Sequence, residues 1–147
     1  MRATQRLRYA IYGAFDLAYH GSSKPVPIQV IGARQRIPAR YLEQIFQRLR
    51  RAGLVQSKRG PGGGYCLARD PAEITLADLA RAVEGSLLQG VPEPSPEDGS
   101  TGPDFVWERL ADALESALSE VSLAALCREA AQRRVGRADA GPSMYHI

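Results

Sequence analysis

Residues 33–65 read ARQRIPARYLEQIFQRLRRAGLVQSKRGPGGGY, and this stretch decides the fold. From residue 34 onward it carries eight basic side chains and a single acid, Glu43, so its local charge is +7. The basic residues are Arg34, Arg36, Arg40, Arg48, Arg50, Arg51, Lys58 and Arg59. A cationic cluster this dense, on a segment that also carries a core-facing stripe, is typical of a surface that binds a polyanion.

The middle of this stretch predicts an amphipathic helix. Pro38 is tolerated in a first helical turn, and Gly53 suits the left-handed residue that ends a helix. The residues that recur at the spacing of one apolar face are Leu42, Ile45, Phe46 and Leu49. The residues that share another face are Arg40, Glu43, Gln44, Gln47 and Arg51. These side-chain types hydrogen-bond base edges or phosphates, although a solvated polar face is the plain alternative.

A glycine-rich turn follows this helix and separates two strand candidates. Leu54–Ser57 and Tyr65–Leu67 flank Lys58–Gly64, which holds one proline and four glycines. Strand, glycine turn and strand predict a hairpin, and the two cations at its tip make it a basic wing. A phosphate cradle at Gly62–Gly64 is the alternative, but no Lys-Ser/Thr pair follows and no helix begins there.

Upstream, residues 26–36 predict a short helix that ends near Arg36. Helix, turn, helix and wing together make a winged helix-turn-helix, in which the second helix enters the major groove and the wing lies along the backbone. The predicted fold class is therefore mostly α with a small β-wing, as a DNA-binding domain that is joined to a long dimerisation helix.

The longer run PARYLEQIFQRLRRAGLVQSKRGPGGGYCLARDPAEITLADLARAVEG, residues 38–85, resembles the Rrf-type family of bacterial transcriptional regulators. Members of this family include the repressor of iron–sulfur cluster assembly genes. The similarity spans about residues 4–85, with a weaker match in the helix that starts near Asp104. It implies a homodimeric DNA-binding repressor or activator, and we expect repression from a near-palindromic operator whose half-sites lie about 34 Å apart.

The resemblance also assigns the DNA contacts. Glu43 and Gln44, from the YLEQ motif, would read bases, and Arg59 in the wing would reach the backbone or a minor groove. Pro38 stands where many relatives carry an N-capping serine. The residues expected to contact phosphates are Arg40, Arg48, Arg50, Arg51 and Lys58. The other residues assigned to the DNA surface are Arg34, Tyr41, Gln47, Gly60, Pro61, Gly62 and Gly63.

The chain divides by charge and composition. Residues 1–85 hold 14 Lys/Arg and 6 Asp/Glu, a balance of +8, whereas residues 86–147 hold 5 and 10, a balance of −5. This asymmetry indicates that only the first part meets nucleic acid. We expect a DNA-binding domain over 1–85, a flexible effector-type loop over 86–103, dimerisation helices over 104–134 and a tail over 135–147. A first helix is predicted over residues 4–20. A Thr75–Asp78 capping box begins a second helix, which stops at Gly85. Ser122 is the expected N-cap of the final helix.

The helix that follows Pro103 is apolar beyond the needs of a small domain, so we expect it to meet a second copy of the chain. Covering its own core is the alternative. The residues expected at the dimer contact are Val106, Trp107, Leu110, Leu114, Ala117 and Leu118.

No cofactor and no metal site are predicted. In the cluster-binding members of the family the loop carries three cysteines, whereas residues 86–103 here have none, and Asp104 falls near the position of the fourth ligand. Cluster ligation needs thiolates or imidazoles. His20, Cys66, Cys127 and His146 match no paired-ligand spacing. The alternatives are a regulator controlled by a metabolic enzyme or other protein partner, and a cluster or redox sensor with non-standard ligands.

An enzyme is disfavoured, because no paired carboxylates, nucleophile with its base, or phosphate loop can be identified. No apolar run has the length of a membrane span, no signal-peptide pattern follows Met1, and two cysteines make no disulfide framework. The expected location is the cytoplasm, in association with the nucleoid.

Overall fold

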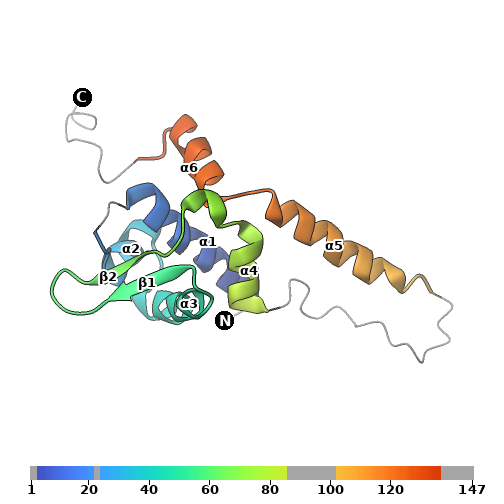
Figure 1. The fold of residues 1–147 in the computed structure, drawn as a ribbon, viewed down its shortest axis with the longest axis horizontal. Coiled ribbons are helices and arrows are strands. Elements are labelled where there is room, and N and C mark those ends of the chain that lie inside the picture. The colour runs from blue at the N-terminus through green and yellow to red at the C-terminus, as the bar shows by residue number, and fades with distance from the viewer. Residues whose placement is uncertain (1–2, 22–23, 86–101, 137–147) are drawn as a thin grey trace.

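The computed structural model describes residues 3–21, 24–85 and 102–136, and most of the predicted loop and tail (86–101 and 137–147) lie outside them. The elements are α1 (Ala3–His20), α2 (Ile28–Gln35), α3 (Ala39–Arg51), β1 (Val55–Lys58), β2 (Gly64–Leu67), the short 3₁₀ helix η1 (Pro71–Glu73), α4 (Leu76–Glu84), α5 (Phe105–Ser119) and α6 (Leu123–Gln132). The predicted class, mostly α with a small two-stranded wing, is confirmed (Figure 1).

Helix α1 forms the centre of the bundle, and α2, α3, α4 and α6 all pack against it. The predicted apolar face of α3 is buried there, with Leu42, Phe46 and Leu49 at 0% exposure. Gly13 allows this close packing, because a Cβ on it would lie 2.7 Å from the ring of Phe46. The polar face of α3 is consequently turned outward.

The two wing strands pair in antiparallel register, from Val55 opposite Leu67 to Lys58 opposite Gly64. A third segment pairs with the wing, which was not predicted from the sequence. Val26 and Tyr65 exchange backbone N–H···O bonds of 2.8 Å in both directions, which ties the wing to the segment before α2. Gly64 is required at this junction, since it has φ +149° and a Cβ on it would lie 2.3 Å from the Val26 carbonyl.

Helix α4 begins with the predicted capping box. The Thr75 hydroxyl accepts a bond from the Asp78 N–H at 3.2 Å, and the Asp78 carboxylate accepts one from the Thr75 N–H at 3.0 Å. Burial alone would raise the pKa of Asp78, but the bonds from Thr75 and Arg81 outweigh it and hold that pKa below the ordinary value of 3.8. Both halves of this cap depend on residues within one helical turn, so it could be predicted from sequence. Before α4, residues 71–73 form the 3₁₀ turn η1, and the Asp70 carboxylate caps it by accepting a bond from the Ala72 N–H.

Helices α5 and α6 differ in how they relate to the bundle. In Figure 1 α5 (orange) extends away from it, and none of its residues is buried. Helix α6, capped by Ser122 as predicted, turns back onto α1 and η1 and buries Leu123 completely. Although the sequence grouped the two helices together, α6 contributes to the core that α1 organises. No helix in the described part of the chain is both long and apolar enough to cross a membrane.

Candidate nucleic-acid interface

The turn between α2 and α3 is tight and has a defined geometry. Arg36 ends α2 in the left-handed region with φ 57°. The Ile37 N–H then donates to the Gly32 carbonyl at 3.0 Å. Gly32 has no side chain to obstruct this contact, whereas a Cβ there would lie 2.7 Å from the Ile37 oxygen. The turn therefore fixes the angle at which α3 leaves the bundle.

Helix α3 presents its polar face to solvent, as predicted. All five residues of that face are exposed: Arg40, Glu43, Gln44, Gln47 and Arg51. At about 100° per residue, four of these side chains fall within an arc of roughly 60°, with Glu43 about 40° beyond it. The structure thus brings together a compact strip that a DNA groove can accept.

The wing continues this polar surface. Lys58, Arg59 and Pro61 are exposed, as are Gly60 and Gly62, which both have positive φ. The tip closes through a Gly63 N–H bond to the Gly60 carbonyl at 2.9 Å, and Gly63 is half-buried. With no side chains on its glycines, the tip lets its backbone approach a partner closely.

Contacts across α3 and the wing hold these two parts in a fixed relation. The rings of Phe46 and Tyr65 lie 4.8 Å apart between centroids, and Arg50 donates to the Ser57 hydroxyl at 3.1 Å. Tyr65 also pairs with Val26. One connected surface is therefore formed by α3, the wing and the segment before α2.

Arg34, one of the residues predicted at the DNA surface, has a partner within the chain. Its guanidinium donates twice to the carboxylate of Asp16, at 3.0 and 2.7 Å, and Gln35 adds a third bond at 2.9 Å. The Asp16 side chain is 0% exposed and that of Arg34 is 24% exposed, so this cluster holds α2 to α1. A DNA contact by Arg34 stays a prediction. Asp16 was not among the residues predicted from sequence. Its signal was an acid within the apolar run Ala14–Ala18, where a charge needs a partner.

Arg48 and Tyr41 also have partners within the chain. Arg48 is exposed, yet its Nη1 donates to the Val83 carbonyl of α4 at 2.6 Å, so it connects α3 to α4 as well as facing solvent. Tyr41 is half-buried, and its ring stacks on Tyr9 with centroids 6.1 Å apart. A DNA contact by either residue stays a prediction.

The residues assigned to the dimer contact fall into two groups. Leu114 and Leu118 are half-buried, on the side of α5 that faces α4, where Arg81 pairs with Glu115. Val106, Trp107, Leu110 and Ala117 are exposed, and Leu110 is 46% exposed. Part of the predicted apolar face therefore belongs to the monomer, and the rest is without cover among the described residues.

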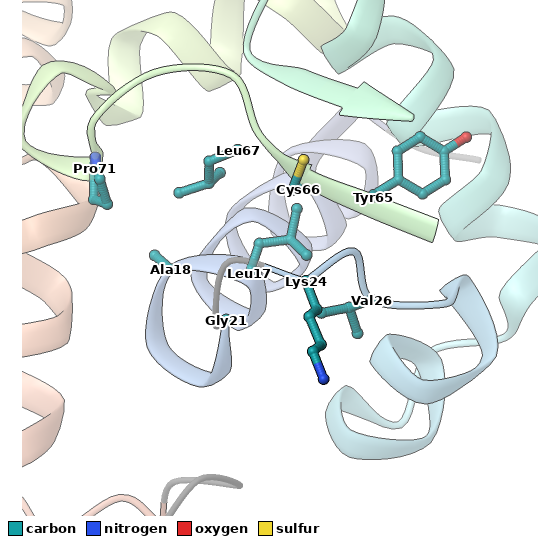
Figure 2. Close-up of a pocket in the computed structure, with 9 residues that line it drawn as sticks. All are labelled: Leu17, Ala18, Gly21, Lys24, Val26, Tyr65, Cys66, Leu67 and Pro71. Atoms are coloured by element: carbon teal, nitrogen blue, oxygen red, sulfur yellow. The ribbon is translucent and has the colours of Figure 1, made fainter. Parts of the chain in front are cut away.

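The cysteines lie on different elements, Cys66 on β2 and Cys127 on α6, and both are half-buried and outside any disulfide. Cys66 lines a pocket of about 190 Å³ between α1, the segment before α2 and β2. In Figure 2 Leu17 occupies the centre of this view, and the amino end of Lys24 is directed away from the Cys66 sulfur. The pocket thus does not bring this cation and the thiol together.

Comparison with known proteins gives consistent matches. Residues 3–129 match the family model Rrf2, described as an iron-dependent transcriptional regulator. The HTH-type transcriptional regulator IscR of Photorhabdus laumondii subsp. laumondii is 42% identical over 132 residues, which cover 84% of this chain and 77% of the relative. The corresponding protein of Xenorhabdus nematophila is 40% identical over 137 residues, covering 87% and 80%.

Two solved structures match over most of their length. The structure of T. potens IscR has 34% identity and a TM-score of 0.73, and the match covers 99% of this chain and 97% of that one. The structure of CymR (YrzC), the global cysteine regulator of B. subtilis, has 31% identity and a TM-score of 0.73, with 88% and 98% covered.

The donor set of this chain does not fit an iron–sulfur cluster. Such a cluster takes four thiolate or mixed thiolate and imidazole ligands at close range. His20, Cys66 and Cys127 lie on three different elements, α1, β2 and α6, and residues 86–103 hold no cysteine. Within residues 3–21, 24–85 and 102–136, no three His, Cys, Asp or Glu side chains gather closely enough to hold a metal ion. Iron dependence in the form of a bound cluster therefore does not follow from the family match.

Proposed function

This chain belongs to the Rrf2 family of DNA-binding transcriptional regulators, and from this premise we propose that two copies of it bind a near-palindromic operator and repress transcription. The observation that carries the proposal is the connected cationic surface made by the polar strip of α3 and the glycine-rich tip of the wing. Two such surfaces would enter successive major grooves, with half-sites about 34 Å apart. A regulator of this kind would act in the cytoplasm, on the nucleoid.

Within this surface the exposed side chains divide by role. Gln44 and Glu43 are the base readers, because amide and carboxylate groups match the donor and acceptor patterns of adenine and cytosine in the major groove. Lys58 and Arg59 lie on the wing, where they would neutralise phosphates or reach a minor groove. The domain organisation that follows is a DNA-binding part over 1–85, an effector-type loop over 86–103 and the dimerisation helix α5.

The test of the proposal compares Gln44→Ala with Lys58→Ala on an operator selected by the wild-type protein from random duplexes. Gln44→Ala should lose about 1–3 kcal/mol of discrimination at one base pair. Lys58→Ala should weaken operator and scrambled DNA alike and reduce the salt slope by about 1. Fluorescence anisotropy at several salt concentrations measures both. Full site preference in Gln44→Ala would remove that residue from base reading, and a wild-type protein that selects no duplex would overturn the function.

Dimerisation through α5 is supported by the exposed apolar side chains Val106, Trp107 and Leu110. Apolar surface of this kind on a projecting helix is typical of a protein–protein contact. A protein partner of another kind would use the same surface. Sedimentation of the purified protein distinguishes the two, because self-association needs no second protein.

We propose that this regulator works without an iron–sulfur cluster, since residues 86–103 hold no cysteine and no cluster of metal-ligating side chains forms within residues 3–21, 24–85 and 102–136. Protein purified without oxygen should show no visible charge-transfer bands and no stoichiometric iron or sulfide. A protein with a known [2Fe–2S] cluster, purified in parallel, is the control. Visible bands with stoichiometric iron and sulfide in this protein would contradict the proposal.

A further inference from the structure

We propose that Arg40 reads a guanine in the major groove and thus determines part of the operator sequence. This inference rests on the proposed operator binding, and it adds one more base pair of the operator that the protein recognises. Arg40 lies four residues before Gln44, which is about 6 Å along the helix axis. Base pairs are spaced by about 3.4 Å, so the guanine should lie roughly two base pairs from the position that Gln44 reads.

The place of Arg40 on α3 supports base reading over phosphate contact. It is the second residue of the helix, and the N-terminal residues of a recognition helix are the ones that reach base edges. It is exposed and, at 100° per residue, lies in the middle of the polar strip. Arg48 and Arg50 flank that strip on its two sides, and they have partners within the chain, the Val83 carbonyl and the Ser57 hydroxyl.

A second observation is that the guanidinium of Arg40 is held in place. Its Nη2 donates to the Tyr41 hydroxyl at 3.0 Å, and its Cζ lies 4.7 Å from the centroid of the same ring. Tyr41 in turn stacks on Tyr9 of α1 at 6.1 Å. The Tyr9 hydroxyl accepts a bond from Gln5 at 2.6 Å. Arg40 is therefore connected through two rings to the central helix of the bundle.

This arrangement suits a bidentate base contact. A guanidinium has five N–H donors, and the bond to Tyr41 uses one of them. Parallel donors remain for the O6 and N7 acceptors of guanine, the commonest specific contact that arginine makes. Fixing the planar group in advance lowers the entropy lost on binding. Fixing the guanidinium increases the affinity of a phosphate contact less, because the positive charge attracts a phosphate in many orientations.

The experiment measures the affinity of Arg40→Ala for the selected operator and for duplexes changed at each half-site position in turn. The wild-type protein should lose roughly 5-fold to 100-fold in affinity when one G·C pair, about two positions from the Gln44-dependent pair, is replaced. In Arg40→Ala that preference should vanish, while the preferences at other positions and the salt slope on scrambled DNA stay unchanged.

Two further variants make the result specific. Arg51→Ala removes the same charge from the other end of the same strip, and it should weaken all duplexes without changing a base preference. Tyr41→Phe keeps the ring but removes the hydroxyl that holds Arg40, so it should reduce the guanine preference by a larger factor than it weakens binding to scrambled DNA. Thermal unfolding of each variant checks that the fold is retained.

The outcomes separate this inference from the proposed function. If Arg40→Ala weakens every duplex alike and lowers the salt slope by about 1, Arg40 is a phosphate contact and the inference is wrong, while operator binding stands. An operator with no guanine preference within three base pairs of the Gln44-dependent pair also overturns it. If the wild-type protein prefers no duplex over any other, both the inference about Arg40 and the proposed operator binding are wrong.

Discussion

Replacing Leu110 with aspartate is expected to leave a folded monomer that binds the operator roughly 100-fold to 10,000-fold more weakly than the wild-type protein. This range is the affinity that is typically lost when one of two linked binding modules is removed. Leu110 is 46% exposed on α5, and no residue of α5 is buried in the monomer, so a charge there has little to disturb within one copy. At a dimer contact, by contrast, the two carboxylates would be desolvated without a partner.

Sedimentation equilibrium measures the mass, and anisotropy on the selected operator measures the affinity. The matched control is Ser116→Asp, which adds the same charge to the same helix at an exposed position roughly 120° around the axis from Leu110. It should remain a dimer with unchanged affinity. If Leu110→Asp also stays dimeric, α5 does not form the contact in the way proposed.

The second large effect is expected on stability, at Asp16. Asp16→Ala should lower the free energy of unfolding by at most about 3–5 kcal/mol, the cost of removing one partner of a fully buried ion pair. The Arg34 side chain is 24% exposed, so water can solvate part of the charge that is left. The Asp16 carboxylate is 0% exposed and accepts three bonds from Arg34 and Gln35, so its loss leaves the Arg34 guanidinium without its main partner. Urea denaturation followed by circular dichroism gives the value.

The control for Asp16 is an ion pair on the surface. Glu129 pairs with Arg133 at 2.9 Å on α6, but these side chains are 55% and 74% exposed. Glu129→Ala should therefore cost only a few tenths of a kcal/mol. The double variant Asp16→Leu with Arg34→Met should recover much of the lost stability, because apolar residues of similar volume often replace a buried pair without loss. Equal small losses at Asp16 and Glu129 would contradict the structural role assigned to Asp16.

Much of the fold could be predicted because its signals are local. The Thr75–Asp78 capping box, the positive φ of Gly53 and the Ser122 cap each depend on residues within one helical turn. The apolar spacing of α3 and the glycine-rich turn of the wing likewise depend on near neighbours, and the structure has both elements within a residue or two of the predicted bounds. The family resemblance, read from residues 38–85, agrees with the match over 3–129.

The parts that could not be predicted are contacts between distant segments. The bridge from Val26 to Tyr65 joins residues on either side of the helix-turn-helix, and no local sequence pattern predicts this pairing. The grouping of α6 with α5 followed their order in the chain, whereas packing brings α6 onto α1. The division of the α5 apolar face, with Leu114 turned toward α4 and Leu110 left exposed, also depends on where α4 lies.

The helices, the wing and the concentration of positive charge between residues 34 and 65 could be predicted from local sequence, because they follow from spacing and from turn residues along a few turns of chain. Tertiary packing, and no local pattern, sets which of those charges gain a partner within the chain. Arg34 is bound to a carboxylate 18 residues away, Arg48 to a carbonyl 35 residues away, and Arg40 is left exposed on its tyrosine. A side chain's availability depends on the partners that folding brings to it, and those partners are set by packing across the core.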